Sequence, residues 1–238
     1  MIELNNVIPL PLLENGLNPC SEVFSRGGVQ FEKGKNYLIS AASGKGKSTL
    51  IHAIYGLRND YQGAVVYENK NLKDLRMDDW ATIRQKKMAV VFQDLRLFLH
   101  LTARENIELK RQLTAQFQIS DAQFQLASTE IRNPKSEIAP PSVSDLENWA
   151  KRLGIAEYLD KTCAMLSYGQ RQRVAIVRAL AQPFDYLLLD EPFSHLDTEN
   201  IAIATAIIKE ACTQQNAGLI LVSLGDKYTF KYDKILQI

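Results

Sequence analysis

The sequence lacks any apolar run that could cross a membrane, and it lacks a marked excess of charge of either sign. Its longest apolar runs, such as residues 219–222, have the length of a strand, whereas a membrane-spanning helix needs about 20 apolar residues. The net charge is +1 over 238 residues, so electrostatics gives no argument for binding to nucleic acid or directly to a membrane surface. We therefore expect a globular chain that does not itself span a membrane and has no nucleic-acid partner.

Cysteine is also scarce. The three cysteines, Cys20, Cys163 and Cys212, are widely spaced and form no C-x-x-C pair, so the sequence predicts neither a disulfide framework nor a zinc site. Three inert, partly buried thiols are expected instead. Residues 1–6 lack the basic and apolar pattern of a signal peptide, which favours a reducing cytoplasm as the location of the chain.

The sequence does contain short apolar runs that alternate with helix-like stretches. Apolar residues make up 46% and charged residues 23%, as in an ordinary globular protein whose core fills one large domain or two small lobes. The runs predicted as strands are residues 2–7, 29–31, 37–39, 63–67, 88–92, 186–189, 219–222 and 234–238. Continuous apolar runs such as 88–92 are typical of buried parallel strands, so we predict an α/β fold.

Local signals place the helices between these strands. Pro9 and Pro11 argue against a helix directly after the first strand, because proline removes a backbone donor. Asp78 and Asp79 predict the start of a short helix, since acidic residues are favoured in a first turn. Thr198 is the predicted cap of a later, long helix.

Two capping-box patterns mark a region that is mostly helical. Thr102 with Glu105, and Ser144 with Glu147, have the S/T-x-x-E spacing in which two side chains satisfy the free N–H groups of a helix start. These starts predict a helical lobe over residues 102–165, inserted into the α/β core.

A glycine- and lysine-rich loop, residues 40–49, follows the apolar run 37–39 and precedes a helix-like stretch. This order lets successive backbone N–H groups and a helix N-terminus face one anion. Lys47 would then reach the β- and γ-phosphates of a nucleotide, and the Ser48 hydroxyl would bind Mg²⁺. Ala41 replaces the first glycine of G-x-x-x-x-G-K-[ST], which requires a negative φ at that position; a surface turn is the alternative interpretation. The loop residues predicted to contact the nucleotide are Ala41, Ala42, Ser43, Gly44, Lys45, Gly46, Lys47, Ser48 and Thr49.

Two carboxylates, Asp190 and Glu191, directly follow the apolar run 186–189. If that run is a parallel strand, both lie at the sheet edge where the phosphate loop is expected. Asp190 could hold Mg²⁺ directly or through water, and Glu191 could polarise the attacking water. Acidic pairs at strand ends are common, so the combination with a phosphate loop is what indicates a nucleotide hydrolase.

Three further segments resemble motifs of the ATP-binding cassette (ABC) ATPases. Residues 166–176, L-S-Y-G-Q-R-Q-R-V-A-I, resemble the L-S-G-G-Q signature and the basic helix that follows it. Residues 91–98 resemble the Q-loop around Gln93, and residues 194–197, S-H-L-D, resemble the D-loop. With the phosphate loop and the two carboxylates, five motifs occur in the family's order and cover nearly the whole chain. The chain is therefore identified as a member of this family.

The resemblance implies a fold for the whole chain, 1–238, as a single ABC ATPase domain. Residues 1–101 and 166–238 would form a P-loop NTPase core with a mixed sheet and an antiparallel β subdomain. Residues 102–165 would form the inserted α-helical signature subdomain.

The resemblance also implies a paired site for ATP and Mg²⁺. Cassettes of this family work head to tail, with ATP held between the phosphate loop of one subunit and the signature helix of its partner. Ser167, Gly169 and Gln170 would thus contact the nucleotide of a second ABC subunit, either an identical chain or a sibling. The expected catalytic residues are Glu191, Gln93 and Lys47. The expected metal ligands are Ser48, Gln93 and Asp190.

A membrane partner follows from the same resemblance. The chain would be an ATP hydrolase subunit that couples ATP binding and hydrolysis to an integral-membrane permease on a separate chain, and it would lie in the cytoplasm on the inner face of the cell membrane. Residues 84–107 resemble most the branch that serves lipoprotein release, cell division and antibiotic export. Two alternatives stay open: a non-transport ABC ATPase, and a degenerate regulatory cassette that binds ATP with little turnover.

The sequence departs from the family at positions that matter for catalysis. Leu224 stands where the switch histidine belongs, and leucine cannot donate a hydrogen bond to the γ-phosphate, so we expect slow hydrolysis. His195 could compensate in part, although an interface role is the simpler interpretation. Tyr168 replaces the first signature glycine and must find room at a dimer seam. The family's adenine-stacking aromatic is missing; residues 8–11 occupy its place, and Phe24 is a possible substitute, although a core position is the simpler expectation for it.

Overall fold

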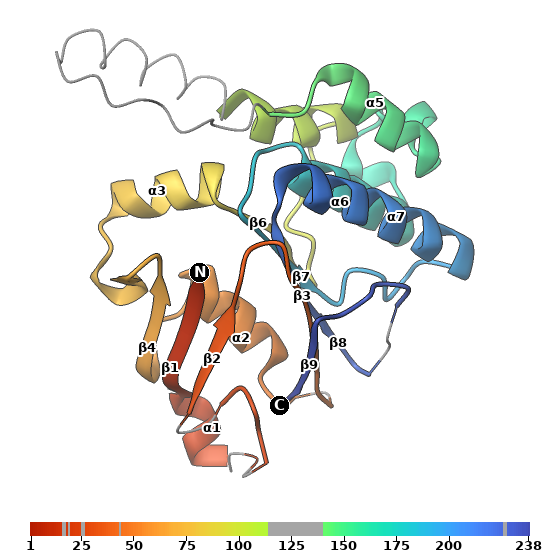
Figure 1. Ribbon diagram of the computed structural model, residues 1–238. Helices are drawn as coiled ribbons and strands as arrows, with labels where there is room; N and C mark the ends of the chain where they lie inside the picture. The colour runs from red at the N-terminus through yellow and green to blue at the C-terminus, as the bar shows by residue number, and fades with distance from the viewer. Residues whose placement is uncertain (16–17, 19, 25–26, 43, 114–139, 226–227) are drawn as a thin grey trace, which may run out of the picture.

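The structure is a computed structural model that describes residues 1–238 except 16–17, 19, 25–26, 43, 114–139 and 226–227. It contains two sheets with helices packed around them (Figure 1). The predicted α/β fold with an antiparallel β unit is confirmed. The core sheet, which was expected to be mixed, has only parallel pairs among its described strands.

The larger sheet has five strands in the order β6-β7-β8-β3-β9, and each neighbouring pair is parallel. Its strands are β3 (Asn36–Ser40), β6 (Met88–Val91), β7 (Tyr186–Asp190), β8 (Gly218–Ser223) and β9 (Lys234–Gln237). Four of them coincide with continuous apolar runs, as expected for strands covered on both faces. The edge strand β9 begins with Lys234 and ends with Gln237, and only its Leu236 is buried.

The smaller sheet is antiparallel, with the order β2-β1-β4-β5. Its strands are β1 (Ile2–Pro9), β2 (Gly28–Phe31), β4 (Tyr61–Tyr67) and β5 (Lys70–Asn71). The pairing of β1 with β4 shifts register between Asn5 and Ile8, and Gly63 lies opposite this irregularity with φ of 77°. A Cβ at Gly63 would lie 2.2 Å from the carbonyl oxygen of Asn6, so only glycine fits there.

Helices connect the strands. They are α1 (Leu10–Asn15), α2 (Lys47–Ile54), α3 (Met77–Lys86), the helix that covers residues 103–113, α5 (Val143–Arg152), α6 (Tyr168–Leu180) and α7 (Thr198–Gln215). Short 3-10 turns lie at Leu72–Asp74, Ala156–Tyr158 and Cys163–Met165. The Thr102–Glu105 capping box is confirmed, because the backbone N–H of Thr102 donates to the Glu105 carboxylate at 2.7 Å and the N–H of Glu105 donates to the Thr102 hydroxyl at 3.1 Å.

Three sequence predictions about helix starts were wrong. Helix α1 begins directly after Pro9 and contains Pro11, because proline in a first turn removes an N–H that has no partner within the helix. Helix α5 is capped by Ser142 with Asp145, which lie two residues before the predicted pair. Helix α7 is capped by Asp197, whose carboxylate accepts from the N–H of Asn200.

Alternate residues of the parallel strands face two different hydrophobic clusters. Leu187 and Leu189 of β7 lie in the cluster beneath α5, α6 and α7, whereas Tyr186 and Leu188 lie in the cluster shared with α2 and the antiparallel sheet. This alternation is the two-residue period of a strand. The parallel sheet therefore separates the two halves of the core.

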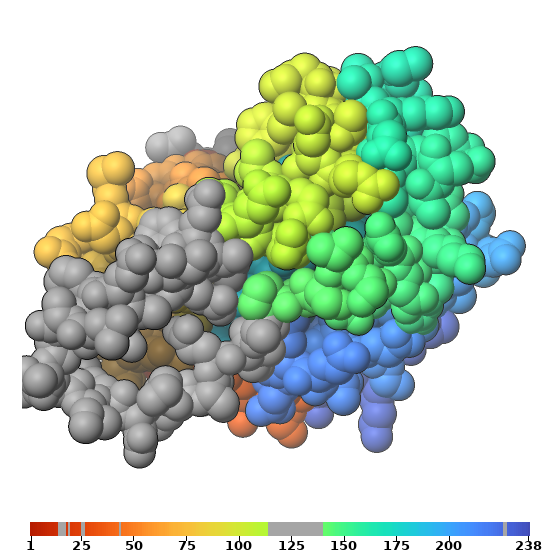
Figure 2. All heavy atoms as spheres, turned by 90° about the horizontal axis from the view of Figure 1, so that it is seen from above, coloured from red at the N-terminus to blue at the C-terminus, as the bar shows by residue number. Residues whose placement is uncertain are grey.

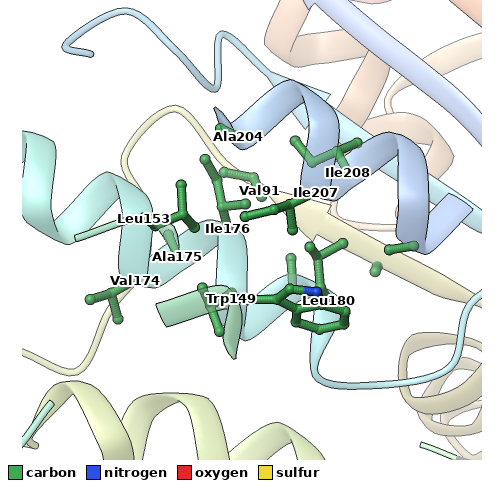
Figure 3. Close-up of a cluster of buried hydrophobic side chains, with 14 of the residues drawn as sticks. Val91, Trp149, Leu153, Val174, Ala175, Ile176, Leu180, Ala204, Ile207 and Ile208 are labelled. Carbon is green, nitrogen blue, oxygen red and sulfur yellow. The ribbon is translucent and has the colours of Figure 1, made fainter. Parts of the chain in front are cut away.

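The expected helical lobe shares the first of these clusters with α6 and α7. Trp149 of α5 and Leu153, the C-cap of α5, meet Ile176 and Leu180 of α6, with Ile207 of α7 beside them (Figure 3). On the surface, residues 103–113 and α5 form adjoining parts of one face (Figure 2). Among the described residues, no helix has the length and apolarity needed to cross a membrane.

Candidate functional site

The parallel strands deliver four of the predicted site segments to one edge of the sheet. The carboxyl end of β3 leads to Ala41, that of β6 to Gln93, that of β7 to Glu191 and that of β8 to Leu224. This is the edge at which open α/β sheets bind ligands. A cavity of about 330 Å³ opens there. Its lining residues are Pro11, Leu12, Gly44, Gly46, Lys47, Ser48, Thr49, Gln93 and Glu191.

The loop between β3 and α2 has the conformation that an anion-binding loop needs. Gly44 and Gly46 have φ values of 75° and 97°, and α2 begins at Lys47. Gly46 is the N-cap and has no side chain to cover the first N–H groups of the helix, which leaves them facing the cavity mouth. Ala41 has no positive φ and is 5% exposed, so alanine fits in place of glycine. Ser43 lies outside the described residues, and Lys45 is exposed on the surface.

Lys47 is the cation at the centre of the cavity. Its ammonium donates to the carbonyl oxygens of Ala41 and Ala42, each at 3.1 Å, and lies 3.3 Å from a carboxylate oxygen of Glu191. The residue is 6% exposed. A buried ammonium with two neutral acceptors and one carboxylate is arranged to bind a further anion, because a phosphate would supply the stronger charge-assisted hydrogen bonds.

Oxygen atoms of three predicted metal ligands gather beside the lysine. The Ser48 hydroxyl lies 3.5 Å from the side-chain oxygen of Gln93. Asp190 is 1% exposed, and its Oδ1 has no hydrogen-bond partner among the described residues. Burial raises the pKa of Asp190, while the Ser48 hydroxyl and the Lys47 charge act in the opposite direction. A buried, unsatisfied carboxylate oxygen next to a hydroxyl and an amide oxygen fits a hard cation such as Mg²⁺.

Glu191 is held in an unusual backbone conformation. Its φ is 48°, in the left-handed region that non-glycine residues seldom adopt, and its N–H donates to the carbonyl oxygen of Val222 at 3.0 Å. Left-handed residues that persist in a folded protein cluster at functional sites, because the surroundings must hold them there. The conformation places the carboxylate on the cavity beside Lys47 instead of under the sheet.

The signature residues stand at the start of α6 and do not line the cavity of their own chain. Ser167 caps the helix by accepting from the N–H of Gln170 at 3.2 Å, and the Gln170 side chain accepts from the N–H of Ser167 at 2.8 Å. A Cβ at Gly169 would lie 3.0 Å from the carbonyl oxygen of His195, a tight contact that favours glycine. This exposed helix N-terminus could face an anion presented by another molecule.

Tyr168 turns back onto its own chain. Its hydroxyl donates to the carbonyl oxygen of Gln93 at 2.8 Å, and its ring meets the ring of His195 with 4.3 Å between centroids. The Tyr168 side chain is therefore accommodated beside the D-loop of its own subunit.

Sequence reasoning missed a buried glutamine that connects the same segments. Gln172 is 1% exposed; its amide donates to the carbonyl oxygen of Glu191 at 3.4 Å and its oxygen accepts from the N–H of His195 at 3.2 Å. A polar residue on the apolar side of α6 was the signal that could have found it.

One wall of the cavity is aliphatic, near the residues where the sequence offers no adenine-stacking aromatic. Pro11 and Leu12 of α1 line it, and the Leu12 side chain lies against Gly46. Phe24 is 1% exposed and packs beneath Gly46, so it is a core residue and not a base platform. The side chain of Leu224 is 55% exposed at the end of β8 and offers no hydrogen-bond donor.

Comparison with known proteins places these observations in a family. A family model described as ABC transporter matches residues 25–194. The thiamine import ATP-binding protein ThiQ of Haemophilus influenzae (strain 86-028NP) is 31% identical over 223 residues, which are 94% of this chain and 87% of that relative. The lipoprotein-releasing system ATP-binding protein LolD of Buchnera aphidicola subsp. Schizaphis graminum (strain Sg) is 28% identical over 210 residues, 88% of this chain and 82% of the relative. Among solved structures, the dimeric structure of MJ0796, a bacterial ABC transporter cassette, superposes with a TM-score of 0.72 at 25% identity and covers 94% of this chain and 88% of that chain.

Proposed function

The chain belongs to the ABC transporter family, and we propose that it is a cassette subunit that binds Mg-ATP in a head-to-tail pair and drives a membrane permease. The observation that carries this proposal is the meeting of Lys47, Ser48, Gln93 and Glu191 around one cavity at the carboxyl edge of the parallel sheet. A phosphate-binding lysine, two oxygen ligands and a carboxylate base are the parts that phosphoryl transfer to water requires.

Each residue has one task in this proposal. The N–H groups of residues 44–49 and the Lys47 ammonium hold the phosphates. Glu191, beside Lys47, accepts a proton from the attacking water and orients it. Ser167, Gly169 and Gln170 of a second subunit close the site, because their helix N-terminus favours the terminal phosphate. Lys45 contributes only its backbone N–H, because its side chain is exposed. Ala41 and Ala42 shape the turn, and Ser43, which lies outside the described residues, stays a predicted nucleotide contact.

Magnesium fits the residues present. Ser48, Gln93 and Asp190 would hold the ion, and Asp190 has the buried, unsatisfied oxygen that such a ligand needs. When bound, Mg²⁺ neutralises the phosphate oxygens on which charge develops. No group of three or more His, Cys, Asp and Glu side chains in the described part of the chain could hold a metal, which agrees with an ion that takes several of its ligands from phosphates and water.

The membrane partner and the subunit organisation belong to the same proposal. Residues 102–165 would act as the helical signature subdomain and the rest of 1–238 as the core, with a permease on a separate chain and the cassette on the inner face of the membrane. The relatives ThiQ and LolD are a thiamine import and a lipoprotein-release ATP-binding protein. Because the chain is similar to both, we propose the class of machine and assign no cargo.

Hydrolysis in this cassette would be slow. Leu224 supplies no donor to the γ-phosphate, and loss of one such preorganised donor lowers a rate by about 10²–10³-fold. Glu191 and Lys47 remain in place, so turnover would be reduced and not abolished. His195 is engaged by the ring of Tyr168 and lies beside the signature, which supports an interface position for it.

The test is binding and hydrolysis of Mg-ATP by the purified chain, with Lys47→Ala and Lys45→Ala as a matched pair. Lys47→Ala removes charge-assisted hydrogen bonds worth about 1.5–3 kcal/mol, so ATP affinity should fall about 10–100-fold and phosphate release should disappear. Lys45 is exposed and should tolerate alanine with little change. If both variants bind Mg-ATP as the unmodified chain does, or if the unmodified chain does not bind it, the proposal fails.

A further inference from the structure

The segment that carries Gln93 has an unfavourable backbone conformation, which contacts from other segments must stabilise. Leu95 and Arg96 have φ values of 59° and 45°, two consecutive non-glycine residues in the left-handed region. Such conformations are unfavourable for residues with a side chain and persist only when the surroundings hold them. Residues 93–96 are called the Q-loop segment below.

The first stabilising contact comes from Arg178 in the last turn of α6. The Arg178 guanidinium donates to the carbonyl oxygens of Leu95 and Arg96, at 2.5 and 2.6 Å. Removal from water lowers the pKa of Arg178 to about 10, so the guanidinium stays charged at neutral pH. Two charge-assisted hydrogen bonds from one rigid group fix the orientation of both left-handed peptides.

The second stabilising contact comes from Tyr168, the first residue of the same helix. The Tyr168 hydroxyl donates to the carbonyl oxygen of Gln93, 75 residues away in the sequence, while the residue is 36% exposed. The ring is placed by the edge contact with His195 and by the Arg171 guanidinium 5.5 Å from its centroid. A side chain at the surface has many other orientations available, so three contacts on one ring select this one.

We propose that Tyr168 is a positioning residue, which holds the Gln93 peptide so that the Gln93 side chain faces Ser48. The inference rests on the proposed function for the task of Gln93, although the contact itself does not. Glycine, which the family has at this position, has no hydroxyl to make this bond. The neighbouring Ser167 and Gly169 would face the nucleotide of the partner subunit. The Tyr168 hydroxyl would therefore connect the helix start that closes the partner's site to Gln93 in the site of its own subunit.

Tyr168→Phe tests the inference because it removes the hydroxyl and keeps the ring. Amide hydrogen exchange of the Q-loop segment should accelerate up to about tenfold, since local opening loses one hydrogen bond. Tyr67→Phe is the matched control: its hydroxyl donates to Asp185 at 2.8 Å, away from the Q-loop segment. That control should leave exchange in residues 93–96 unchanged. Equal exchange in the unmodified chain and Tyr168→Phe overturns the inference, whether or not the chain hydrolyses ATP.

A kinetic cycle tests whether the contact acts through the Gln93 side chain. Tyr168→Phe should lower kcat for ATP by up to about tenfold with little change in KM. In a Gln93→Ala background, which keeps the backbone carbonyl, the same change should have almost no effect on kcat, because coupled residues are not additive. An equal loss in both backgrounds, or no loss in either, contradicts the positioning role. Absence of Lys47-dependent hydrolysis in the unmodified chain would instead count against the proposed function and leave the exchange result to decide.

Discussion

Leu224 follows the carboxyl end of β8, at the sheet edge that a nucleotide would face. Its side chain has no atom that can donate a hydrogen bond. The side chain is 55% exposed, so a polar residue of similar size should be accepted there without strain. We expect Leu224→His to raise ATP turnover by about tenfold or more, up to the 10²–10³ that one preorganised donor contributes. Steady-state phosphate release at saturating Mg-ATP measures the effect.

Leu224→Met is the control for that substitution, because it changes the shape and adds no donor. Its turnover should equal that of the unmodified chain. Turnover at ordinary transporter rates in the unmodified chain, or an equal rise in both variants, would contradict the explanation.

The three thiols should differ sharply in reactivity. Cys20 is exposed, whereas Cys163 and Cys212 are buried. Burial raises the pKa of the Cys212 thiol to about 12 and also raises the pKa of Cys163, so neither forms much of the reactive thiolate near pH 8. A thiol reagent should therefore modify one cysteine in the native protein and three after denaturation. Cys20→Ser should abolish the native reaction; rapid loss of a second thiol would contradict the packing around α7 and Cys163.

At the scale of single residues, the sequence predicted the members of the site better than their contacts. Lys47, Asp190 and Glu191 could be found because a short motif fixes each of them relative to a strand end. The bond from Tyr168 to Gln93 could not, because it joins residues 75 apart and depends on how α6 lies across the sheet. The left-handed backbone of Glu191 was equally out of reach, since no local preference of glutamate favours it.

Among the elements, helix α5 offers a direct test of where a helix begins. The Ser142 hydroxyl accepts from the N–H of Asp145 at 3.2 Å, and the Asp145 carboxylate accepts from the N–H of Ser142 at 2.9 Å. Ser142→Ala should lower the free energy of unfolding by about 1 kcal/mol, the usual effect of losing an N-cap. Chemical denaturation measures the difference.

Ser144→Ala provides the comparison, because Ser144 is the cap that the S-x-x-E pattern predicts. Its hydroxyl makes an exposed hydrogen bond with the Ser142 hydroxyl at 2.8 Å and caps no backbone N–H among the described residues of α5, so we expect the substitution to change stability by only a few tenths of a kcal/mol. A larger loss for Ser144→Ala than for Ser142→Ala would restore the pattern-based assignment.

Most strands could be predicted because they lie on short apolar runs, and five of those runs became the parallel sheet. Strand β5 was missed because its two residues, Lys70 and Asn71, are polar. The helix starts were less predictable because several nearby Ser, Thr and Asp side chains can each serve as a cap. Around α5 the chain offers Ser142 and Ser144 with Asp145 and Glu147 within one turn. Packing of Leu146 and Trp149 against the core selects among them.

For the whole molecule, the family resemblance supplied what periodicity and spacing did not: the two-sheet architecture and the expectation that a second subunit completes the site. In the structure, Lys47 and Glu191 line the cavity, whereas Ser167 and Gly169 lie at a separate, exposed helix start. If the partner is a second copy of this chain, two defects should complement each other. Lys47→Ala removes the phosphate-binding cation, and Ser167→Arg blocks the helix start.

Each variant alone should be inactive, because both sites of its dimer carry the defect. In an equal mixture about half of the dimers contain one chain of each kind, and each of these has one intact site, formed by the unmodified loop of one chain and the unmodified helix start of the other. Phosphate release should therefore recover to about a quarter of the unmodified level, provided that the two sites act independently. A mixture of Lys47→Ala with itself prepared in the same way is the control. No recovery would contradict a pair of identical chains with independent sites, since every mixed dimer of that pair contains one intact site.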